Sequence, residues 1–194
     1  MHGEAKKQKG DRMLHIIRHG KTDWNVLHKL QGRTDIPLNE EGRRMAAEAG
    51  ERCREISFDI CYCSPLIRAR ETAEILMKNR DIPIVLDDRL KEMCFGTWEG
   101  YENVFEKTDS PMYTFFKDPL HYVAPEGAES FDELFTRTGS FLNEIVKPAL
   151  QERKKILIVG HGAMNSSIVC QVKNLPLSEF WSAGIENCKL MRLI

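Results

Sequence analysis

The chain carries two similar stretches, LHIIRHG at residues 14–20 and ILIVGHG at residues 156–162. Each is a short apolar run that stops at a His-Gly pair. Such a run is typical of a buried strand in a parallel sheet, and the glycine after it indicates a tight turn into the next element. Because ligands of open α/β sheets bind beyond the carboxyl ends of the strands, we expect His19 and His161 at that edge. Arg18 precedes the first histidine, so the pair is predicted to face an anion.

Strand and helix signals alternate along the chain, which predicts an α/β fold: a three-layer α/β/α sandwich with a mostly parallel central sheet. The predicted strands span residues 13–18, 59–63, 82–86, 155–159 and 188–194. The predicted helices span residues 40–55, 64–78, 130–151 and 164–173. Asn39 is expected to cap the first helix, and Ser64-Pro65 is expected to open the second.

A length of 194 residues favours a single domain over residues 1–194. Residues 1–12 are polar and charged, lack the apolar stretch of a secretory signal, and are predicted to be flexible. Residues 91–128 break the alternation with glycines and prolines, while aromatic residues recur. We therefore expect a partly helical excursion there that forms a wall or lid over the edge of the sheet.

Composition excludes several classes of function. A formal net charge of -1 offers no basic field for nucleic acid, and no segment is apolar enough for a membrane helix. The six cysteines show no CxxC spacing, so buried thiols are favoured over a zinc pair at Cys61 and Cys63. We expect neither a metal nor a cofactor, and reduced thiols favour a cytoplasmic location. The sequence leaves open whether the chain forms a homo-oligomer.

Two further charged residues are expected at the same edge of the sheet. Arg68 lies in the first turn of the helix predicted after strand 59–63, and that helix N-terminus should offer free backbone N–H groups to an anion. Glu92 follows the strand at 82–86, where the aromatic excursion begins. Glu99 and Glu102 are close enough in sequence to be alternatives to Glu92. Arg68 could instead be a surface cation.

This set of side chains fits phosphoryl transfer. A phosphomonoester carries about -1.5 to -2 charges near neutral pH, and two guanidinium groups can neutralise that charge with bidentate hydrogen bonds. A neutral imidazole can attack phosphorus, and a second imidazole can donate to an oxygen of the transition state. A carboxylic acid can protonate the leaving oxygen and later accept a proton from water. No step requires a metal.

Residues 18–25, RHGKTDWN, resemble the RHGxTxxN signature of the histidine phosphatase superfamily in its phosphoglycerate-mutase-like branch. The resemblance continues in order through QG at 31–32, DIPLNEEG at 35–42, SPLIRARETA at 64–73, LKEMCFGTWEG at 90–100, GAES at 127–130 and VGHG at 159–162. It spans about residues 13–194. The chain departs from the family at Gly160, where serine is frequent, and at Ala128, where glycine is commoner, which puts substrate fit in question.

The resemblance implies a phosphoric monoester hydrolase that acts without metal on small phosphorylated metabolites through a phosphohistidine. It assigns residues as follows: His19 as nucleophile, Glu92 as proton donor and acceptor, Arg18, Arg68 and His161 as phosphate ligands, and Asn25, Gln31, Gly32 and Gly162 as lining of the pocket. Asn25 could instead cap a turn. Relatives of similar size include α-ribazole phosphatases and broad-specificity phosphatases.

Two alternatives remain: a cofactor-dependent phosphoglycerate mutase, and a non-catalytic relative that only binds a phosphorylated ligand. The short separation of Glu92 from His161, and the end of the chain directly after its last predicted strand, favour a compact phosphatase over a mutase. The intact set of charged residues argues against a non-catalytic relative.

Overall fold

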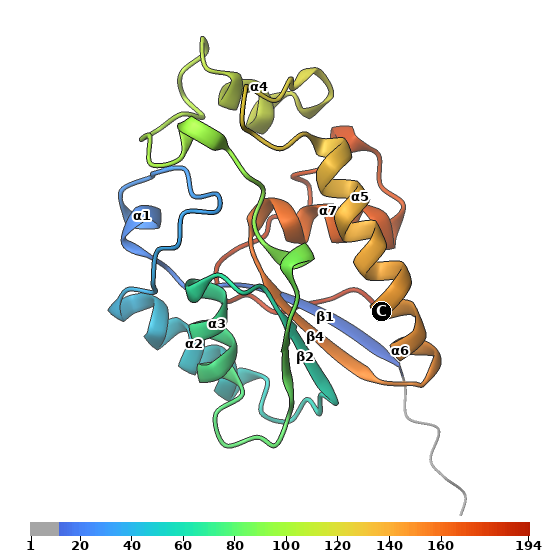
Figure 1. Ribbon diagram of the computed structural model, residues 1–194. Coiled ribbons are helices and arrows are strands. Elements are labelled where there is room, and N and C mark those ends of the chain that lie inside the picture. The colour runs from blue at the N-terminus through green and yellow to red at the C-terminus, as the bar shows by residue number, and fades with distance from the viewer. Residues whose placement is uncertain (1–11) are drawn as a thin grey trace, which may run out of the picture.

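A computed structural model describes residues 12–194 (Figure 1). Five strands form one sheet in the order β3-β2-β4-β1-β5. They are β1 (Met13–Arg18), β2 (Ile60–Cys63), β3 (Ile84–Leu86), β4 (Lys155–Gly160) and β5 (Met191–Arg192). All neighbours pair in parallel except β1 and β5, which are antiparallel. The predicted α/β class with a mostly parallel sheet is therefore confirmed.

The principal helices are α1 (Asp23–Val26), α2 (Glu40–Arg52), α3 (Ile67–Leu76), α4 (Pro111–Lys117), α5 (Phe131–Phe141), α6 (Lys147–Gln151) and α7 (Gly162–Lys173). Short 3₁₀ turns lie at Asp88–Leu90, Gly96–Trp98, Pro119–His121 and Leu177–Glu179.

Within residues 12–194, none of the helices is long and apolar enough to cross a membrane. The flexible start predicted for residues 1–12 falls, apart from Arg12, outside the described residues, and the single-domain organisation stays a prediction.

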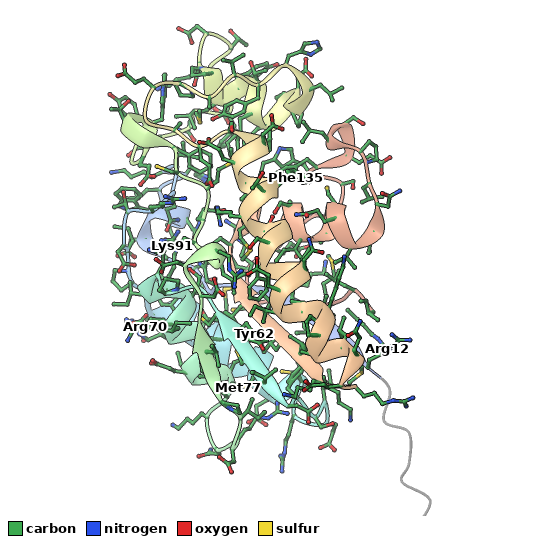
Figure 2. The ribbon with its side chains drawn as sticks, turned by 45° about the vertical axis from the view of Figure 1, so that its right-hand side comes forward. Arg12, Tyr62, Arg70, Met77, Lys91 and Phe135 are labelled. Carbon is green, nitrogen blue, oxygen red and sulfur yellow. The ribbon has the colours of Figure 1, made fainter. Side chains whose placement is uncertain are left out.

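Helices cover both faces of the sheet, with α2 and α3 on one side and α5, α6 and α7 on the other (Figure 1). Successive strand residues point to opposite faces, so neighbours in sequence pack against different layers. Ile17 and Val159 pack against α2 and α3, whereas Ile16 and Ile158 pack against α7 and the end of α5. Tyr62 of β2 faces the second layer (Figure 2). This double coverage explains why the strands are apolar throughout.

The register of β1 and β4 brings the two His-Gly pairs together. Arg18 lies opposite Gly160 in the parallel ladder, and the backbone N–H of His19 donates to the Gly160 carbonyl at 2.9 Å. Both strands therefore end at the same level, and His19 and His161 are each the next residue. The chain turns away from β1 at Gly20, where a Cβ would lie 2.4 Å from the Gly42 carbonyl oxygen at the start of α2.

Several predicted boundaries are wrong by a few residues. The Ser64-Pro65 pair does not open a helix directly, because α3 begins at Ile67 with Leu66 as its N-cap. The helix predicted over 130–151 begins where expected, with Ser130 as its N-cap, but contains a π-helical turn at Leu142–Val146. Pro148 follows that turn and has no N–H to continue the α-helical ladder. The strand predicted over 188–194 is reduced to β5.

Residues 91–128 lie above the sheet and contain α4 and two of the 3₁₀ turns (Figure 1). Phe115 of α4 is fully buried and contacts Phe95, Phe131 and Trp181. The segment is thus held to α5 and to the C-terminal region by a separate aromatic core, and it forms a wall beside the sheet edge.

Candidate active site

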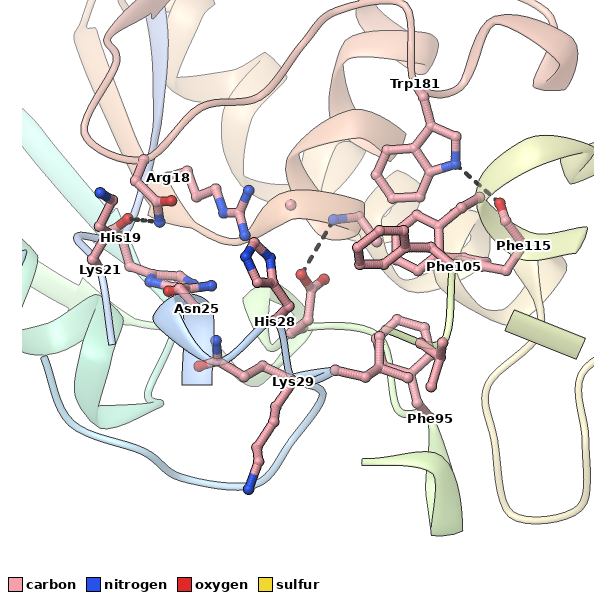
Figure 3. Close-up of a pocket in the computed structure, with 18 residues that line it drawn as sticks. Arg18, His19, Lys21, Asn25, His28, Lys29, Phe95, Phe105, Phe115 and Trp181 are labelled. Carbon is pink, nitrogen blue, oxygen red and sulfur yellow. Dashed lines mark hydrogen bonds between the residues drawn. The ribbon is translucent and has the colours of Figure 1, made fainter. Parts of the chain in front are cut away.

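His19 is buried, and its ring is oriented by two contacts. Its Nδ1 lies 2.7 Å from the Gly20 carbonyl oxygen, and its Nε2 lies 3.3 Å from Arg68 Nε. Since a carbonyl oxygen only accepts hydrogen bonds, Nδ1 carries the proton and Nε2 keeps its lone pair. Asn187 donates to the His19 carbonyl oxygen at 2.7 Å (Figure 3). The ring therefore presents an unprotonated Nε2.

Arg68, the second residue of α3, has no solvent exposure and is held by three acceptors. Besides the contact with His19, its Nη1 donates to the Thr34 carbonyl at 3.0 Å and its Nη2 donates to the Gly32 carbonyl at 2.7 Å. Burial lowers the pKa of Arg68 to about 10, so the group stays cationic at neutral pH. The prediction that Arg68 belongs to the site rather than to the surface agrees with this position.

Gly32 does not line the pocket, contrary to expectation; its carbonyl positions Arg68 instead. The turn that contains it is held by Glu99, which accepts hydrogen bonds from the backbone N–H groups of Arg33 at 2.9 Å and Thr34 at 2.8 Å. A Cβ on Gly32 would lie 2.0 Å from Glu99 Oε1. Glu99 therefore stabilises this turn and does not take the role that we assign to Glu92.

Glu92 lies beneath the N-terminus of α7 and is buried. Its carboxylate accepts backbone N–H groups from Met93 at 2.9 Å, Met164 at 3.0 Å and Ala163 at 3.2 Å. The positive end of the helix dipole adds to their attraction for the carboxylate. Glu92 is therefore fixed at the wall of the pocket.

Arg18 and Glu92 flank Gly162. A Cβ on Gly162 would lie 3.6 Å from Glu92 Oε2 and 3.7 Å from Arg18 Cζ, in ordinary van der Waals contact with both, so Gly162 lies directly beside the two charged groups. Arg18 Nη1 donates to the Ile185 carbonyl at 3.1 Å, while its Nε is buried without a partner. An anion could satisfy this free donor.

His161 lies next to His19, with ring centroids 5.1 Å apart, and is fully buried. Its Nε2 is 2.8 Å from the Ser64 hydroxyl, which also accepts the Leu66 N–H. If the hydroxyl donates to Nε2, the proton of His161 resides on Nδ1, which has no partner. Ser64 was missed as a site residue because the Ser-Pro pair indicated only a helix start.

The pocket next to these groups has a volume of about 350 Å³. Arg18, His19, Asn25, Gln31, Glu92 and Gly162 line it (Figure 3), whereas Arg68 and His161 are buried next to His19 and do not line it. Gln31 accepts from the Thr22 hydroxyl at 2.9 Å, and its Nε2 is buried without a partner. Asn25 both lines the pocket and forms a capping box with Thr22. Its two predicted roles, in the pocket and as a cap, are therefore compatible.

At the N-terminus of α3, where free backbone N–H groups were expected, the Ile67 N–H already donates to Asp35 at 2.7 Å. Sequence reasoning also missed Asn187, which lies in a loop before β5 without a recognisable motif.

Within residues 12–194, no cluster of three or more His, Cys, Asp or Glu side chains is arranged to hold a metal ion. Cys61 and Cys63 both face the apolar core.

Both imidazoles are neutral near pH 7. Burial, followed by the charges of Arg68 and Arg18, holds the pKa of His19 well below its ordinary value of 6.5. Burial and Arg68 likewise hold the pKa of His161 well below that value. A neutral ring is the form that can act as a nucleophile.

We expect NMR titration to find His19 and His161 still neutral at pH 6. Below about pH 6.5 the unfolded chain binds protons that these folded histidines do not, so the free energy of unfolding should fall as the pH falls through this range. An imidazole ¹⁵N signal from either residue that titrates near 6.5 would contradict the assignment. The Arg68→Gln variant, which loses the largest of the charge effects on His19, should move the titration of His19 upward.

Comparison with known proteins agrees with this geometry. The family model for the histidine phosphatase superfamily (branch 1) matches residues 14–194. The chain is 38% identical over 157 residues, covering 81% of it and 75% of the relative, to an uncharacterized phosphatase, PhoE, of Bacillus subtilis. It is 30% identical over 184 residues, covering 93% of it and 83% of the relative, to a probable phosphoglycerate mutase, GpmB, of Proteus mirabilis.

Among solved structures, YhfR of Bacillus stearothermophilus superposes with a TM-score of 0.84 at 33% identity and covers 93% of this chain and 89% of its own. The fold, the ordered motifs and the relatives agree. The chain belongs to the histidine phosphatase superfamily (branch 1) and is a phosphoric monoester hydrolase.

Proposed function

We propose that the chain hydrolyses small phosphomonoesters in the cytoplasm, without a metal, through a phosphohistidine on His19. One observation carries the proposal: an unprotonated Nε2 of His19 lies 3.3 Å from the buried guanidinium of Arg68, and His19 lines the same pocket as Arg18 and the fixed carboxylate of Glu92. Buried nitrogens of Arg18, Gln31 and His161 have no partner, and phosphate oxygens are acceptors that would satisfy them.

In the first step, the Nε2 lone pair attacks phosphorus and the bond to the leaving oxygen breaks. Arg68 Nε, 3.3 Å from Nε2, is within reach of an oxygen on the phosphorus bound there. Arg18 and Arg68 neutralise the charge on the equatorial oxygens, and protonated Glu92 gives its proton to the leaving oxygen.

In the second step, water attacks phosphorus and the bond to Nε2 breaks. Ionised Glu92 accepts the proton of the water, so the acid of the first step becomes the base of the second. Inorganic phosphate leaves, and the enzyme returns to its starting protonation state.

Metal independence is tested with a chelator. Because the arginines supply the positive charge that a metal ion would otherwise provide, we expect EDTA to leave phosphate release unchanged within about twofold. Activity that falls at least tenfold and returns on addition of a divalent cation would contradict the proposal.

The role of Glu92 is tested with two leaving groups. Glu92→Gln cannot donate a carboxyl proton, so we expect kcat/KM to fall by roughly 10²–10⁴-fold for alkyl phosphates. The loss should be much smaller for p-nitrophenyl phosphate, whose leaving group needs little protonation. The control is Glu126→Gln, since Glu126 is an exposed carboxylate on the same segment and does not line the pocket. Equal losses on both substrates would remove Glu92 from the role of acid.

The relatives named as mutases support one alternative. A mutase would isomerise 3-phosphoglycerate, in the presence of trace 2,3-bisphosphoglycerate, faster than it releases phosphate. We expect phosphate release to be faster. Isomerisation that outruns hydrolysis would replace the phosphatase proposal with the mutase.

The proposed location rests on the cysteines. All six are free, and five of them are buried. Thiols kept reduced are typical of the cytoplasm. The partner we propose is a small phosphorylated metabolite rather than nucleic acid or a membrane, and association into a homo-oligomer stays a prediction.

A further inference from the structure

The pocket has two unlike ends. Figure 3 shows the charged and polar side chains of Arg18, His19, Lys21 and Asn25 together, and the rings of the excursion and the C-terminal region on the other side, with His28 between the two groups. The floor of the second end is apolar and consists of Leu30, Phe95, Val104 and Phe115, each of them buried. A phosphoryl group bound at His19 would direct its leaving group toward one of these surfaces.

A chain of partly exposed rings borders the apolar end. His28 contacts Phe105 edge to face at 6.5 Å, Phe105 contacts Phe116 at 6.0 Å, and Phe116 stacks on Trp181 at 5.3 Å. The Trp181 indole N–H donates to the Phe115 carbonyl at 3.0 Å (Figure 3). Because its polar atom is already bonded, Trp181 offers the pocket only an apolar face.

The lysines of the pocket are paired with acids. Lys21 Nζ lies 2.8 Å from Glu41, and Lys29 Nζ lies 3.7 Å from Glu102. A second anionic group on the substrate, such as a carboxylate or a second phosphate, would have to compete with Glu41 or Glu102 for these lysines. The described part of the chain thus provides cationic groups for one phosphate at His19 and an apolar surface beyond it.

We propose that the natural leaving group is a hydrophobic, ring-bearing alcohol or phenol without an anionic group of its own. This inference rests on the proposed phosphatase function and names the substrate class of the same site. Hydroxyl groups of a sugar or glycerol would lose water against the ring wall without gaining partners, whereas an aromatic ring would gain apolar and edge-to-face contacts.

The test compares two primary alkyl esters, 2-phenylethyl phosphate and ethyl phosphate, whose leaving oxygens are chemically similar. We expect kcat/KM to be at least about 30-fold higher for the phenylethyl ester, from burial of the phenyl ring. 3-Phosphoglycerate, O-phosphoserine and glycerol 3-phosphate should not exceed ethyl phosphate. A ratio near one, or a carboxylate-bearing ester as the best substrate, would overturn the inference.

Phe116→Ala removes a central ring of the border and should lower the phenylethyl-to-ethyl ratio about tenfold. Phe105→Ala tests the same surface if Phe116→Ala folds poorly. The control is Leu120→Ala, since Leu120 is 61% exposed on the same segment and outside the pocket. It should leave the ratio unchanged, and an unchanged ratio in both ring variants would contradict the proposal. Failure to release phosphate from any ester would contradict the proposed function instead.

Discussion

His19→Ala should reduce phosphate release by at least about 10⁴-fold and should abolish acid-labile phosphorylation of the protein. The variant keeps the arginines but has no atom that can form a bond to phosphorus. Water would have to attack the ester directly. At the position that Nε2 occupied, the variant has no group that could activate this water. The measurement is kcat/KM on an alkyl phosphate together with rapid acid-free quenching of labelled enzyme.

The control for this substitution is His121→Ala. His121 is exposed and pairs with Asp118 at 2.7 Å, outside the pocket, so its loss should leave turnover unchanged. Circular dichroism and the melting temperature of both variants separate loss of chemistry from loss of fold. Label that stays on the His19→Ala protein would mean that another residue is the nucleophile.

Arg68→Lys should lower kcat/KM by roughly 10²–10³-fold, although the charge is retained. The guanidinium donates in three directions, to His19 and to the carbonyls of Gly32 and Thr34. A lysine ammonium is a single point on a flexible stem, and it cannot hold both carbonyls and also reach the nucleophile with the same geometry. The buried Gly32 carbonyl and the partly buried Thr34 carbonyl would lose their donor, so the melting temperature should fall as well.

Two readouts distinguish a role in the site from a structural role. Arg70→Lys is the matched control, because Arg70 lies two positions further along α3 and is exposed (Figure 2). It should leave kcat/KM within about twofold of the wild type. In Arg68→Lys, inhibition by inorganic phosphate should weaken along with catalysis. Unchanged phosphate affinity with a lower melting temperature would show that Arg68 acts only through folding.

Local sequence predicts the two His-Gly strands because the information needed is local. An apolar run ending at glycine specifies a buried strand and the point where it stops, and the alternation of its residues specifies which face each one meets. The predicted cap behaves similarly: Asn39 starts α2 because its own side chain accepts the Gly42 N–H. The predicted bounds are wrong where a helix is irregular, as in the segment before Pro148, which contains a π-helical turn.

The choice between nearby carboxylates could not be made locally. Glu92 and Glu99 are close in sequence, yet Glu92 meets the N-terminus of α7 and Glu99 meets the turn at residues 32–34. Each receives its backbone donors from a segment distant in the chain. The same holds for Gly32, which positions Arg68, and for Asn187, which holds the backbone of His19.

The sequence alone therefore determined the fold class, the ends of the central strands and the residue types available at the sheet edge. Only the tertiary structure decided that β4 lies directly beside β1 in a register that pairs Arg18 with Gly160, and that Arg68 approaches Nε2 of His19. It also decided that the wall opposite them is made of rings. The reason is physical: hydrophobic periodicity specifies which side of a strand is buried, whereas pairing and side-chain contact depend on packing between segments that the chain keeps far apart.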